Sequence, residues 1–324
     1  MEDKRMLGEY ELNRIYQRDC IEGMRIIPDR SVSLIVIDPP YNIGIKGEAW
    51  DRFSKTEYIE LMGAVFMECQ RVLAPNGSFY WFHNDMPQVA RLMSWLESNS
   101  DFVFNSFVTW DKGDWRALSW KNPSKKSNLR SWFNTAEYCL LYTLHDPDND
   151  GEHFKVVRNY FWSEYDKSGL TIKTANELMG LSTTGANLAG ELFGRNRKRF
   201  CFPTAEKYDR LQSTGYFQKP YHELRSQYEA LVPVHNLSAN HKNVWSYRTE
   251  NTGKYHTCQK PLTVVERIIK TSSNTGDIVL DCFMGSGTTA VAALNTGRNF
   301  IGFETESKYV DIANQRIAQL REAA

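Results

Sequence analysis

The sequence lacks the features that mark several classes of protein. No apolar run approaches the roughly 18 residues that a membrane-spanning helix needs, and the opening MEDKRMLGEYELNR contains no apolar signal core. These absences predict a cytoplasmic protein without a membrane partner. The six cysteines form no C-x-x-C pair, so neither a zinc site nor a disulfide framework is expected, and no metal is predicted. Lys and Arg together number 39, as do Asp and Glu, so any basic surface must be local.

Strand-like and helix-like segments alternate in two regions of the chain. Up to about residue 145 they lie at 32–37, 55–72, 77–82, 86–96, 104–110 and 138–142, with a turn, APNG, expected before the strand at 77–82. From about residue 245 the alternation returns at 262–270, 277–281, 288–295, 299–303 and 307–321. Such alternation is typical of parallel βαβ units, so we predict an α/β fold with a doubly wound, mostly parallel sheet.

The segment between these regions differs from them in composition and pattern. Polar, aromatic and basic residues replace the alternating pattern over 146–244, which we interpret as an insertion. Within it, KTANELMGLSTTGANLAGELFGRNRKRF predicts two short helices joined by a turn and followed by a basic run. The predicted organisation is therefore one domain in two halves, 1–145 and 245–324, with 146–244 inserted between them.

The segment SLIVIDPPYNIG, residues 33–44, joins a buried strand to a rigid corner. Its apolar, β-branched beginning predicts a strand of a parallel sheet. An acid, two prolines and a tyrosine follow, and prolines end strand pairing and fix the local backbone. Asp38 and Tyr41 are therefore expected on a stiff corner at the carboxyl end of this strand.

The segment VLDCFMGSGTTA, residues 279–290, joins a second strand to a helix through a glycine turn. Small residues there let a ligand approach the backbone, and Glu304 ends the next strand, where a ribose-binding acid is expected. These features predict a nucleoside-binding half-fold. An NAD enzyme shares this pattern, but it needs two mononucleotide halves, usually starting near an N-terminal glycine turn, whereas the other half here carries DPPY.

The order of these motifs resembles that of a known family, the S-adenosylmethionine-dependent DNA amino-methyltransferases of the β class. That family has Asp-Pro-Pro-Tyr first, a target-recognition insertion next and Phe-x-Gly-x-Gly last, as 38–41 and 283–287 stand in this sequence. HTCQKPLTVVERII, from His256, is similar to the family's His-Pro-Thr-Gln-Lys-Pro segment but departs from it at Thr257 and Cys258. IYQRDCIEGM, from Ile15, resembles the family's approach to the catalytic motif.

The resemblance implies a permuted, Rossmann-like methyltransferase fold that uses S-adenosylmethionine. It implies that the catalytic residues are Asp38, Pro39, Pro40 and Tyr41. The residues that it implies for cofactor binding are Asp19, Cys20, Asp38, Lys260, Asp281, Phe283, Gly285, Gly287, Thr288 and Glu304.

Amino-group methylation accounts for the rigid corner. The amino group of a base is a poor nucleophile because its lone pair is delocalised into the ring. A carboxylate at Asp38 and the backbone carbonyl of Pro39 can accept the amino hydrogens and direct the lone pair at the methyl donor. Tyr41 can stack on a base that has been flipped out of the duplex.

We predict a site-specific DNA methyltransferase that modifies adenine N6, because Asp at the head of the motif is commoner among the family's adenine enzymes. Cytosine-N4 methylation is the close alternative, and RNA or glutamine methylation also uses related Pro-Pro-Tyr turns. A catalytically inactive DNA-binding module is a hypothesis of a different class, against which the intact Asp38 and glycine turn argue. A cytosine-C5 enzyme would need a cysteine in a Pro-Cys dipeptide, which the sequence lacks.

Two basic segments are candidates for contacting double-stranded DNA. In 111–132, basic residues alternate with tryptophans, so charged groups can meet phosphates while rings support unstacked bases. The second candidate is the basic run at 195–199, with base readout expected from the neighbouring LSTTGAN, 181–187. The predicted DNA-binding residues are Lys112, Trp115, Arg116, Lys121, Lys125, Lys126, Arg130, Arg195, Arg197, Lys198 and Arg199.

The resemblance also implies a setting. Family members are often dimers and can accompany a restriction endonuclease, so a homodimer and a cognate endonuclease are candidate partners besides DNA. The cell would be bacterial, archaeal or infected by a phage.

Overall fold

The computed structural model describes residues 5–44, 51–113, 132, 135–146, 152–181, 188–236, 241–248, 255 and 259–323. The chain divides into two compact units, one made of Met1–Leu144 with Val234–Ala324 and the other of His145–Pro233. The second unit therefore ends earlier than the insertion expected at 146–244. Asn236 explains the difference, because its side chain donates hydrogen bonds to the carbonyl oxygens of Lys270 (3.3 Å) and Ser273 (3.1 Å) in the first unit.

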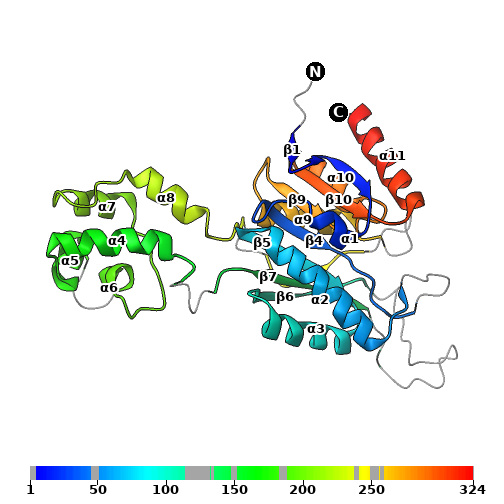
Figure 1. Cartoon of the computed structure of the whole chain (residues 1–324), viewed down its shortest axis with the longest axis horizontal. Coiled ribbons are helices and arrows are strands. Elements are labelled where there is room, and N and C mark those ends of the chain that lie inside the picture. Colours follow the sequence, from blue (N-terminus) through cyan, green and yellow to red (C-terminus); the bar gives the residue numbers. More distant parts are fainter. Residues whose placement is uncertain are drawn as a thin grey trace. The chain divides into compact units, whose positions relative to one another are not determined.

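A sheet of eight strands forms the centre of the first unit, as far as the described residues show it (Figure 1). In spatial order the strands are β3 (Arg14–Gln17), β10 (Asn299–Glu304), β9 (Ile278–Asp281), β4 (Val32–Ile37), β5 (Leu73–His83), β7 (Ala136–Thr143), β6 (Val103–Asp111) and β8 (Val244–Ser246). Neighbouring strands are parallel except around β7, which runs antiparallel to β5 and β6. The predicted mostly parallel α/β sheet is confirmed.

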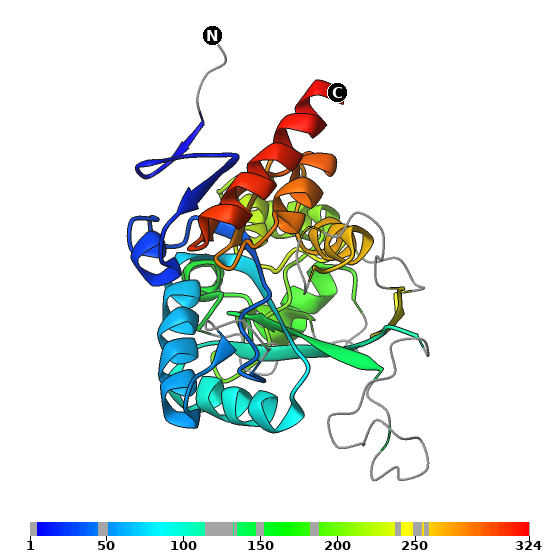
Figure 2. The ribbon, with the colours of Figure 1, turned by 90° about the vertical axis from the view of Figure 1, so that its right-hand side faces the viewer.

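Helices cover both faces of this sheet because successive side chains of a strand point to opposite sides. Along β4, Ile35 and Ile37 pack on one face, whereas Leu34 and Val36 pack on the other. The first face carries α1 (Cys20–Met24), α2 (Lys55–Val72) and α3 (Met86–Asn99); the second carries α9 (Leu262–Ser272), α10 (Thr288–Asn295) and α11 (Ser307–Ala323). Figure 2 shows α2 and α3 apart from α10 and α11, with strands between them. The sheet is therefore doubly wound.

The predicted elements of the first unit appear within a few residues of their expected bounds. Helix α2 begins and ends where expected. Its first residue is set by Ser54, which caps the N-terminus and pairs reciprocally with Glu57. The expectation of a turn at APNG was wrong, since residues 74–77 lie inside β5. Between the Val32–Leu73 and Leu34–Ser78 pairs the register shifts, because residues 74–77 stand opposite the single residue Ser33 of β4 and interrupt the regular pairing.

One edge of the sheet joins segments that are far apart in the sequence. Strands β1 (Met6–Leu7) and β2 (Tyr10–Glu11) form a small antiparallel ribbon, and β3 then pairs with β10. Asn13, in the turn before β3, has φ of 62°, and its side-chain oxygen accepts a hydrogen bond of 3.0 Å from the N–H of Phe300. The segment before α1 is thereby fixed beside the strand that ends in Glu304.

The second unit is helical over its described residues. Its helices are α4 (Lys155–Ser168), α5 (Ile172–Leu178), α6 (Leu188–Phe193), α7 (Ala205–Gln212) and α8 (Tyr221–Glu229). Helices α5 and α6 are the two short helices that the sequence predicted. An aromatic core holds them, in which Tyr208 is fully buried and donates a hydrogen bond of 3.0 Å to the carbonyl of Phe217. Within the described part of the chain, no helix is both long and apolar enough to cross a lipid bilayer.

Candidate active site

The site lies where the sheet changes its winding direction. From β4 the chain moves outward through α2 to β5, and from β9 it moves outward through α10 to β10. Strands β4 and β9 are parallel neighbours, and the loops that leave two such strands in opposite directions have a crevice between them. Asp38 follows β4 and Asp281 ends β9, so the two motifs meet at this crevice.

A cavity of about 360 Å³ opens at these strand ends, which is within the size range of small-molecule sites. The predicted catalytic and cofactor residues that line it are Asp19, Cys20, Asp38, Pro39, Pro40, Tyr41, Lys260, Asp281, Phe283, Gly285, Thr288 and Glu304. Gly287 does not line the cavity: a Cβ there would lie 2.7 Å from the Cβ of Ala313, so this glycine lets α11 pack closely instead.

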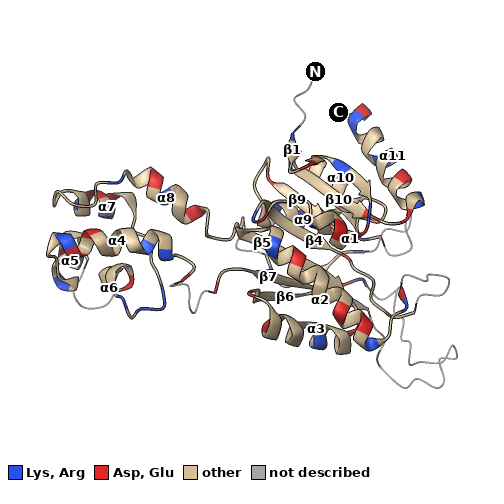
Figure 3. Cartoon of the chain, in the orientation of Figure 1, with Lys and Arg blue, Asp and Glu red and all other residues tan. Residues whose placement is uncertain are grey.

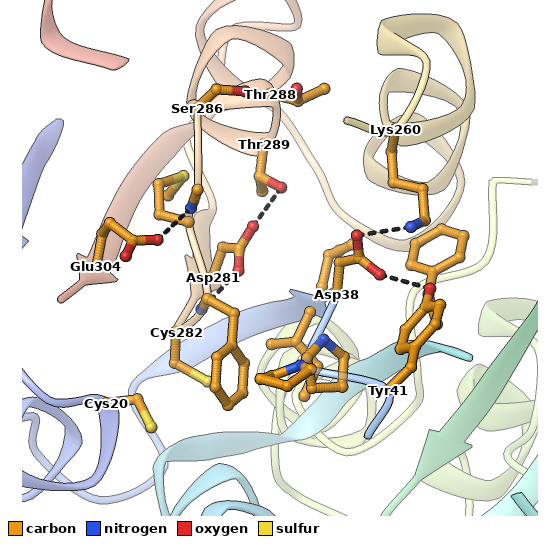
Figure 4. Close-up of a pocket in the computed structure, with 18 of the residues that line it drawn as sticks. Cys20, Asp38, Tyr41, Lys260, Asp281, Cys282, Ser286, Thr288, Thr289 and Glu304 are labelled. Atoms are coloured by element: carbon orange, nitrogen blue, oxygen red, sulfur yellow. Dashed lines mark hydrogen bonds and ion pairs between the residues drawn. The ribbon is translucent and has the colours of Figure 1, made fainter. Parts of the chain in front are cut away.

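Asp38 is held from two sides (Figure 4). Tyr41 Oη donates a hydrogen bond of 2.6 Å to Asp38 Oδ1, and Lys260 Nζ donates one of 2.6 Å to Asp38 Oδ2. The Asp38 side chain remains 24% exposed. Because each carboxylate oxygen has two lone pairs, both held oxygens can still accept a hydrogen from a ligand.

Lys260 lies between two carboxylates. Its Nζ is also 3.2 Å from Glu137 Oε2, and Glu137 Oε1 pairs with Lys112 Nζ at 2.9 Å. Burial alone would raise the pKa of Glu137, but the ammonium groups of Lys260 and Lys112 outweigh burial and lower this pKa. Asp38, Lys260, Glu137 and Lys112 therefore form a row of alternating charges beside the cavity.

Tyr41 is buried in a second network that ties the proline corner to α2. Its ring stacks on His83, with centroids 4.6 Å apart. The N–H of Asp85 donates to His83 Nδ1 (3.0 Å), so the ring proton is on Nε2, which faces Tyr58 Oη at 3.0 Å. Burial lowers the pKa of His83 to about 3, which keeps the ring neutral. Tyr58 Oη donates a hydrogen bond of 2.7 Å to the carbonyl of Pro40.

The backbone after the corner is fixed by a buried acid. Asn42 has φ of 52°, in the left-handed region that asparagine tolerates better than most residues. The carboxylate of Asp51, which is fully buried, accepts hydrogen bonds from the N–H groups of Asn42 (2.6 Å) and Ile43 (3.2 Å). The Asn42 side chain accepts another from the N–H of Phe53 (2.8 Å). These bonds hold the loop that positions Asp38.

Glu304 supports the glycine turn from the neighbouring strand. Its Oε2 accepts a hydrogen bond of 2.8 Å from the N–H of Gly285, and its Oε1 accepts one of 2.8 Å from the N–H of Glu306. Gly285 has φ of 51°, and the nearest atom to a Cβ built there is the Phe283 carbonyl oxygen at 4.0 Å. The backbone is thus open toward the cavity at the position where a ligand was expected.

Asp281 is almost completely buried beneath the turn. Its Oδ1 accepts a hydrogen bond from the N–H of Phe283 (2.9 Å), and its Oδ2 accepts one from Thr289 Oγ1 (2.6 Å). Burial raises the pKa of Asp281 to about 7, against the effect of these two bonds. A cationic ligand group in the cavity would therefore favour the ionised carboxylate.

Asp19 and Cys20 reach the cavity from the start of α1. Asp19 Oδ1 caps that helix by accepting from the N–H groups of Ile21 (2.9 Å) and Glu22 (3.1 Å). The contact of the Cys20 thiol with Cys282, together with burial, raises the pKa of Cys20 far above its ordinary value. Cys20 therefore lines the cavity as a protonated thiol, and its contact with the cofactor stays a prediction.

The predicted DNA-binding residues have different surroundings. Lys112 lines the cavity and is only 17% exposed, because it pairs with Glu137. Six of the others lie outside the described residues, namely Trp115, Arg116, Lys121, Lys125, Lys126 and Arg130, and so does 182–187 of LSTTGAN.

The basic run after α6 lies on the surface of the second unit (Figure 3). Its exposed side chains are Arg195, Arg197, Lys198 and Arg199. Arg195 pairs with Asp166 at 2.5 Å. Beneath the run, the guanidinium of Arg158 is buried and donates hydrogen bonds to the carbonyls of Arg197 (2.8 Å) and Gly194 (3.3 Å). A buried arginine thus holds the loop that displays the basic run.

Comparison with known proteins identifies the family. A family described as DNA methylase, N6_N4_Mtase, matches residues 32–315, from β4 into α11. The chain belongs to this family of N6/N4 DNA methylases. The methylase is 29% identical over 311 residues to the Type II methyltransferase M1.MboII of Moraxella bovis, across 96% of the methylase and 98% of that relative. It is 26% identical over 325 residues to the Type II methyltransferase M.HinfI of Haemophilus influenzae, across 96% and 69% of the two chains.

Two solved structures share the fold of the methylase. The cytosine-N4-specific PvuII DNA methyltransferase superposes with a TM-score of 0.58 at 14% identity, across 93% of the methylase and 85% of that chain. The putative DNA modification methylase TTHA0409 of Thermus thermophilus, complexed with S-adenosylmethionine, superposes with a TM-score of 0.51 at 19% identity, across 94% and 93%. The predicted Rossmann-like methyltransferase fold is confirmed.

The cofactor of the methylase is S-adenosylmethionine, as its family membership requires. The described cavity fits this cofactor: Glu304 offers carboxylate oxygens for hydroxyl groups, Gly285 leaves the backbone open, and Asp281 can respond to a cationic group. Among the residues that the structure describes, no cluster of three or more His, Cys, Asp or Glu could hold a metal ion.

Sequence reasoning missed several residues that shape the site. Glu137 is an acid at the start of an otherwise apolar strand, and Tyr58 and His83 carry polar tips on faces that pack into the core. Each is a polar group at a buried position, which is a signal that the sequence contained. What the sequence did not contain was the partner that each of them would meet.

Proposed function

We propose that the methylase transfers a methyl group from S-adenosylmethionine to the N6 amino group of adenine in double-stranded DNA. The observation that carries the proposal is the fixed carboxylate of Asp38, which faces the same cavity as the glycine turn and Glu304. An Asp at the head of the corner favours adenine over cytosine, by the resemblance described above.

The residues of the corner hold the target amino group. When bound, S-adenosylmethionine supplies a methyl group on a positively charged sulfonium, and the sulfur keeps the electron pair of the broken bond. Asp38 and the carbonyl of Pro39 accept the two amino hydrogens, which localises the nitrogen lone pair for attack. The nitrogen gains positive charge as its bond to the methyl group forms and then loses one proton to water. Asp38 stabilises that charge because its carboxylate is already in place.

The position of Asp38 within the cavity supports extrusion of the target base. A carboxylate in a cavity at the sheet edge can reach an amino group only if the base leaves the stack. Tyr41 is 9% exposed and already stacks on His83, so a base would meet the ring surface that faces the cavity. The Tyr41 hydroxyl also holds Asp38, and this second role adds to the proposed stacking.

The second unit, His145–Pro233, is the proposed target-recognition region. It displays the basic run, whose guanidinium and ammonium groups suit phosphate contacts. Because the curated relatives are bacterial Type II methyltransferases, we include in the proposal a cytoplasmic bacterial enzyme that protects DNA beside a cognate endonuclease. Homodimerisation is part of the same proposal.

Base-resolved sequencing of DNA from a host that expresses the methylase tests the proposal. We expect N6-methyladenine at one recognition sequence, and no modification from Asp38→Ala, which should still bind the cofactor. Methylation of cytosine N4 would overturn the adenine assignment and leave the amino-methyltransferase. No methylation from the wild-type protein, together with retained DNA binding, would indicate an inactive module.

A further inference from the structure

Glu137 is a buried acid of the site that the chemistry described so far does not use. It stands at the start of β7, the antiparallel strand between β5 and β6, so its side chain reaches the edge from which Asp38 emerges. It is 13% exposed and lines the cavity. An ionised acid at such a position is costly unless it is paired, so its partners indicate its role.

The charges around Glu137 determine how much negative charge Asp38 retains. If Lys260 paired with Asp38 alone, the ammonium would cancel the carboxylate that has to face the target amino group. Instead, Lys260 is 7% exposed and lies 2.6 Å from Asp38 Oδ2 and 3.2 Å from Glu137 Oε2. With Lys112 included, the two carboxylates and two ammonium groups balance, and without Glu137 the ammonium groups of Lys260 and Lys112 would outnumber the carboxylate of Asp38. Lys112 contacts the far oxygen of Glu137, Oε1, at 2.9 Å.

We propose that Glu137 is a positioning residue that shares Lys260 with Asp38 and so prevents the positive charge of Lys260 from cancelling the Asp38 carboxylate beside the target amino nitrogen. This inference rests on the proposed function, because its effect appears only when that nitrogen becomes positively charged. Glu137 touches neither substrate nor cofactor in this role and acts through Lys260. The lowered pKa of Glu137 supports the role, since the carboxylate then stays ionised at neutral pH.

A purely structural role for Glu137 makes a different prediction. If Glu137 only neutralised two buried lysines, its loss would lower stability and disturb the cavity, and cofactor affinity would fall along with the rate. If it acts on Asp38 through Lys260, its loss lowers the rate of methyl transfer and leaves cofactor affinity unchanged. The effect must also vanish once Lys260 no longer carries a charge.

The test is a cycle of four proteins: wild type, Glu137→Gln, Lys260→Met and the double variant. Methyl transfer is measured in single turnovers on duplex DNA at saturating cofactor, with cofactor affinity from calorimetry and melting temperature for each protein. We expect Glu137→Gln to slow transfer by about tenfold, less than the 10²–10³ that removing a direct contact to developing charge costs. We expect its cofactor Kd to stay within about threefold of wild type. In the Lys260→Met background, the same change should alter the rate by less than about threefold.

Two further variants keep the outcome decisive. Glu137→Asp retains the charge and should keep most of the rate, and Glu137→Ala, which removes the charge, replaces Glu137→Gln in the cycle if the latter does not fold. Glu97→Gln, an exposed acid of α3, should match wild type. A wild-type rate in Glu137→Gln, or an equal loss in both Lys260 backgrounds, overturns the inference alone. A wild-type protein that transfers no methyl group to any duplex overturns the proposed function as well.

Discussion

Glu304→Ala should weaken cofactor binding by a specific amount. The carboxylate ends β10, and the proposed contact with ribose hydroxyls is charge-assisted, which is worth about 1.5–3 kcal/mol. Loss of that contact should raise the Kd for S-adenosylmethionine by roughly one to two powers of ten. Calorimetry measures this directly. Glu60→Ala, which removes an exposed acid of α2, is the matched control and should bind as wild type does.

The structure adds a second contribution that has to be separated from the first. Glu304 also accepts the N–H groups of Gly285 and Glu306, so the alanine variant loosens the glycine turn as well as losing the hydroxyl contact. Comparing S-adenosylmethionine with an analogue that lacks both ribose hydroxyls separates the two. Wild type should prefer the natural cofactor, and Glu304→Ala should lose that preference. An unchanged Kd in a folded variant, or an undiminished preference for the hydroxyls, would refute the ribose contact.

Three other changes test other parts of the site. Tyr41→Phe keeps the ring on His83 but removes the hydroxyl that holds Asp38, so single-turnover transfer should slow by about tenfold at unchanged cofactor affinity; a wild-type rate would leave only stacking. The pKa of Asp281 is raised in the folded protein. Its carboxyl group therefore ionises above about pH 4 in the unfolded chain but only above about pH 7 in the folded protein. The free energy of unfolding of wild type relative to Asp281→Asn should therefore fall by up to about 4 kcal/mol as pH rises through that window, and a pH-independent difference in denaturant titrations would contradict this. Changing the basic run 195–199 to alanine should weaken cognate and scrambled duplexes equally and reduce the log–log salt slope by about 0.9 per lost contact, whereas an unaltered slope would remove the run from the interface.

The fold could be predicted from the sequence because its signals are local. The β-branched run at 32–37 and the apolar periodicity of 55–72 each specify an element without reference to the rest of the chain. The same holds for Ser54 and Glu57, whose spacing marks the start of α2. APNG failed for the converse reason: its residues favour a turn locally, but β5 pairs with β4 on both sides of them, at Leu73 and again from Ser78, and so includes them in the strand.

The site could be predicted only where a motif carried it. Asp38 and Glu304 were found because each stands in a recognisable segment. Glu137 could not be found, because its role depends on β7 entering the sheet beside β5, and no local pattern reports that pairing. Lys112 was predicted to contact DNA as part of the basic, tryptophan-containing segment 111–132, although its ammonium lies 2.9 Å from Glu137, which no local pattern pairs with it.

The pairing of β3 with β10 has a consequence for synthesis of the protein. Arg14 of β3 cannot pair until Ile301 of β10, its partner, has been synthesised. At about 5–20 residues per second, synthesis of the residues between them takes roughly 15–60 s. For most of that interval β9 has not been synthesised either, so the edge of β4 that will bind β9 has no partner, while the helices of the second unit, which contact one another over short sequence distances, can already form. The order of emergence from the ribosome therefore favours a helical unit that folds early, whereas the sheet and the cofactor cavity at its edge are completed only after release of nearly the whole chain.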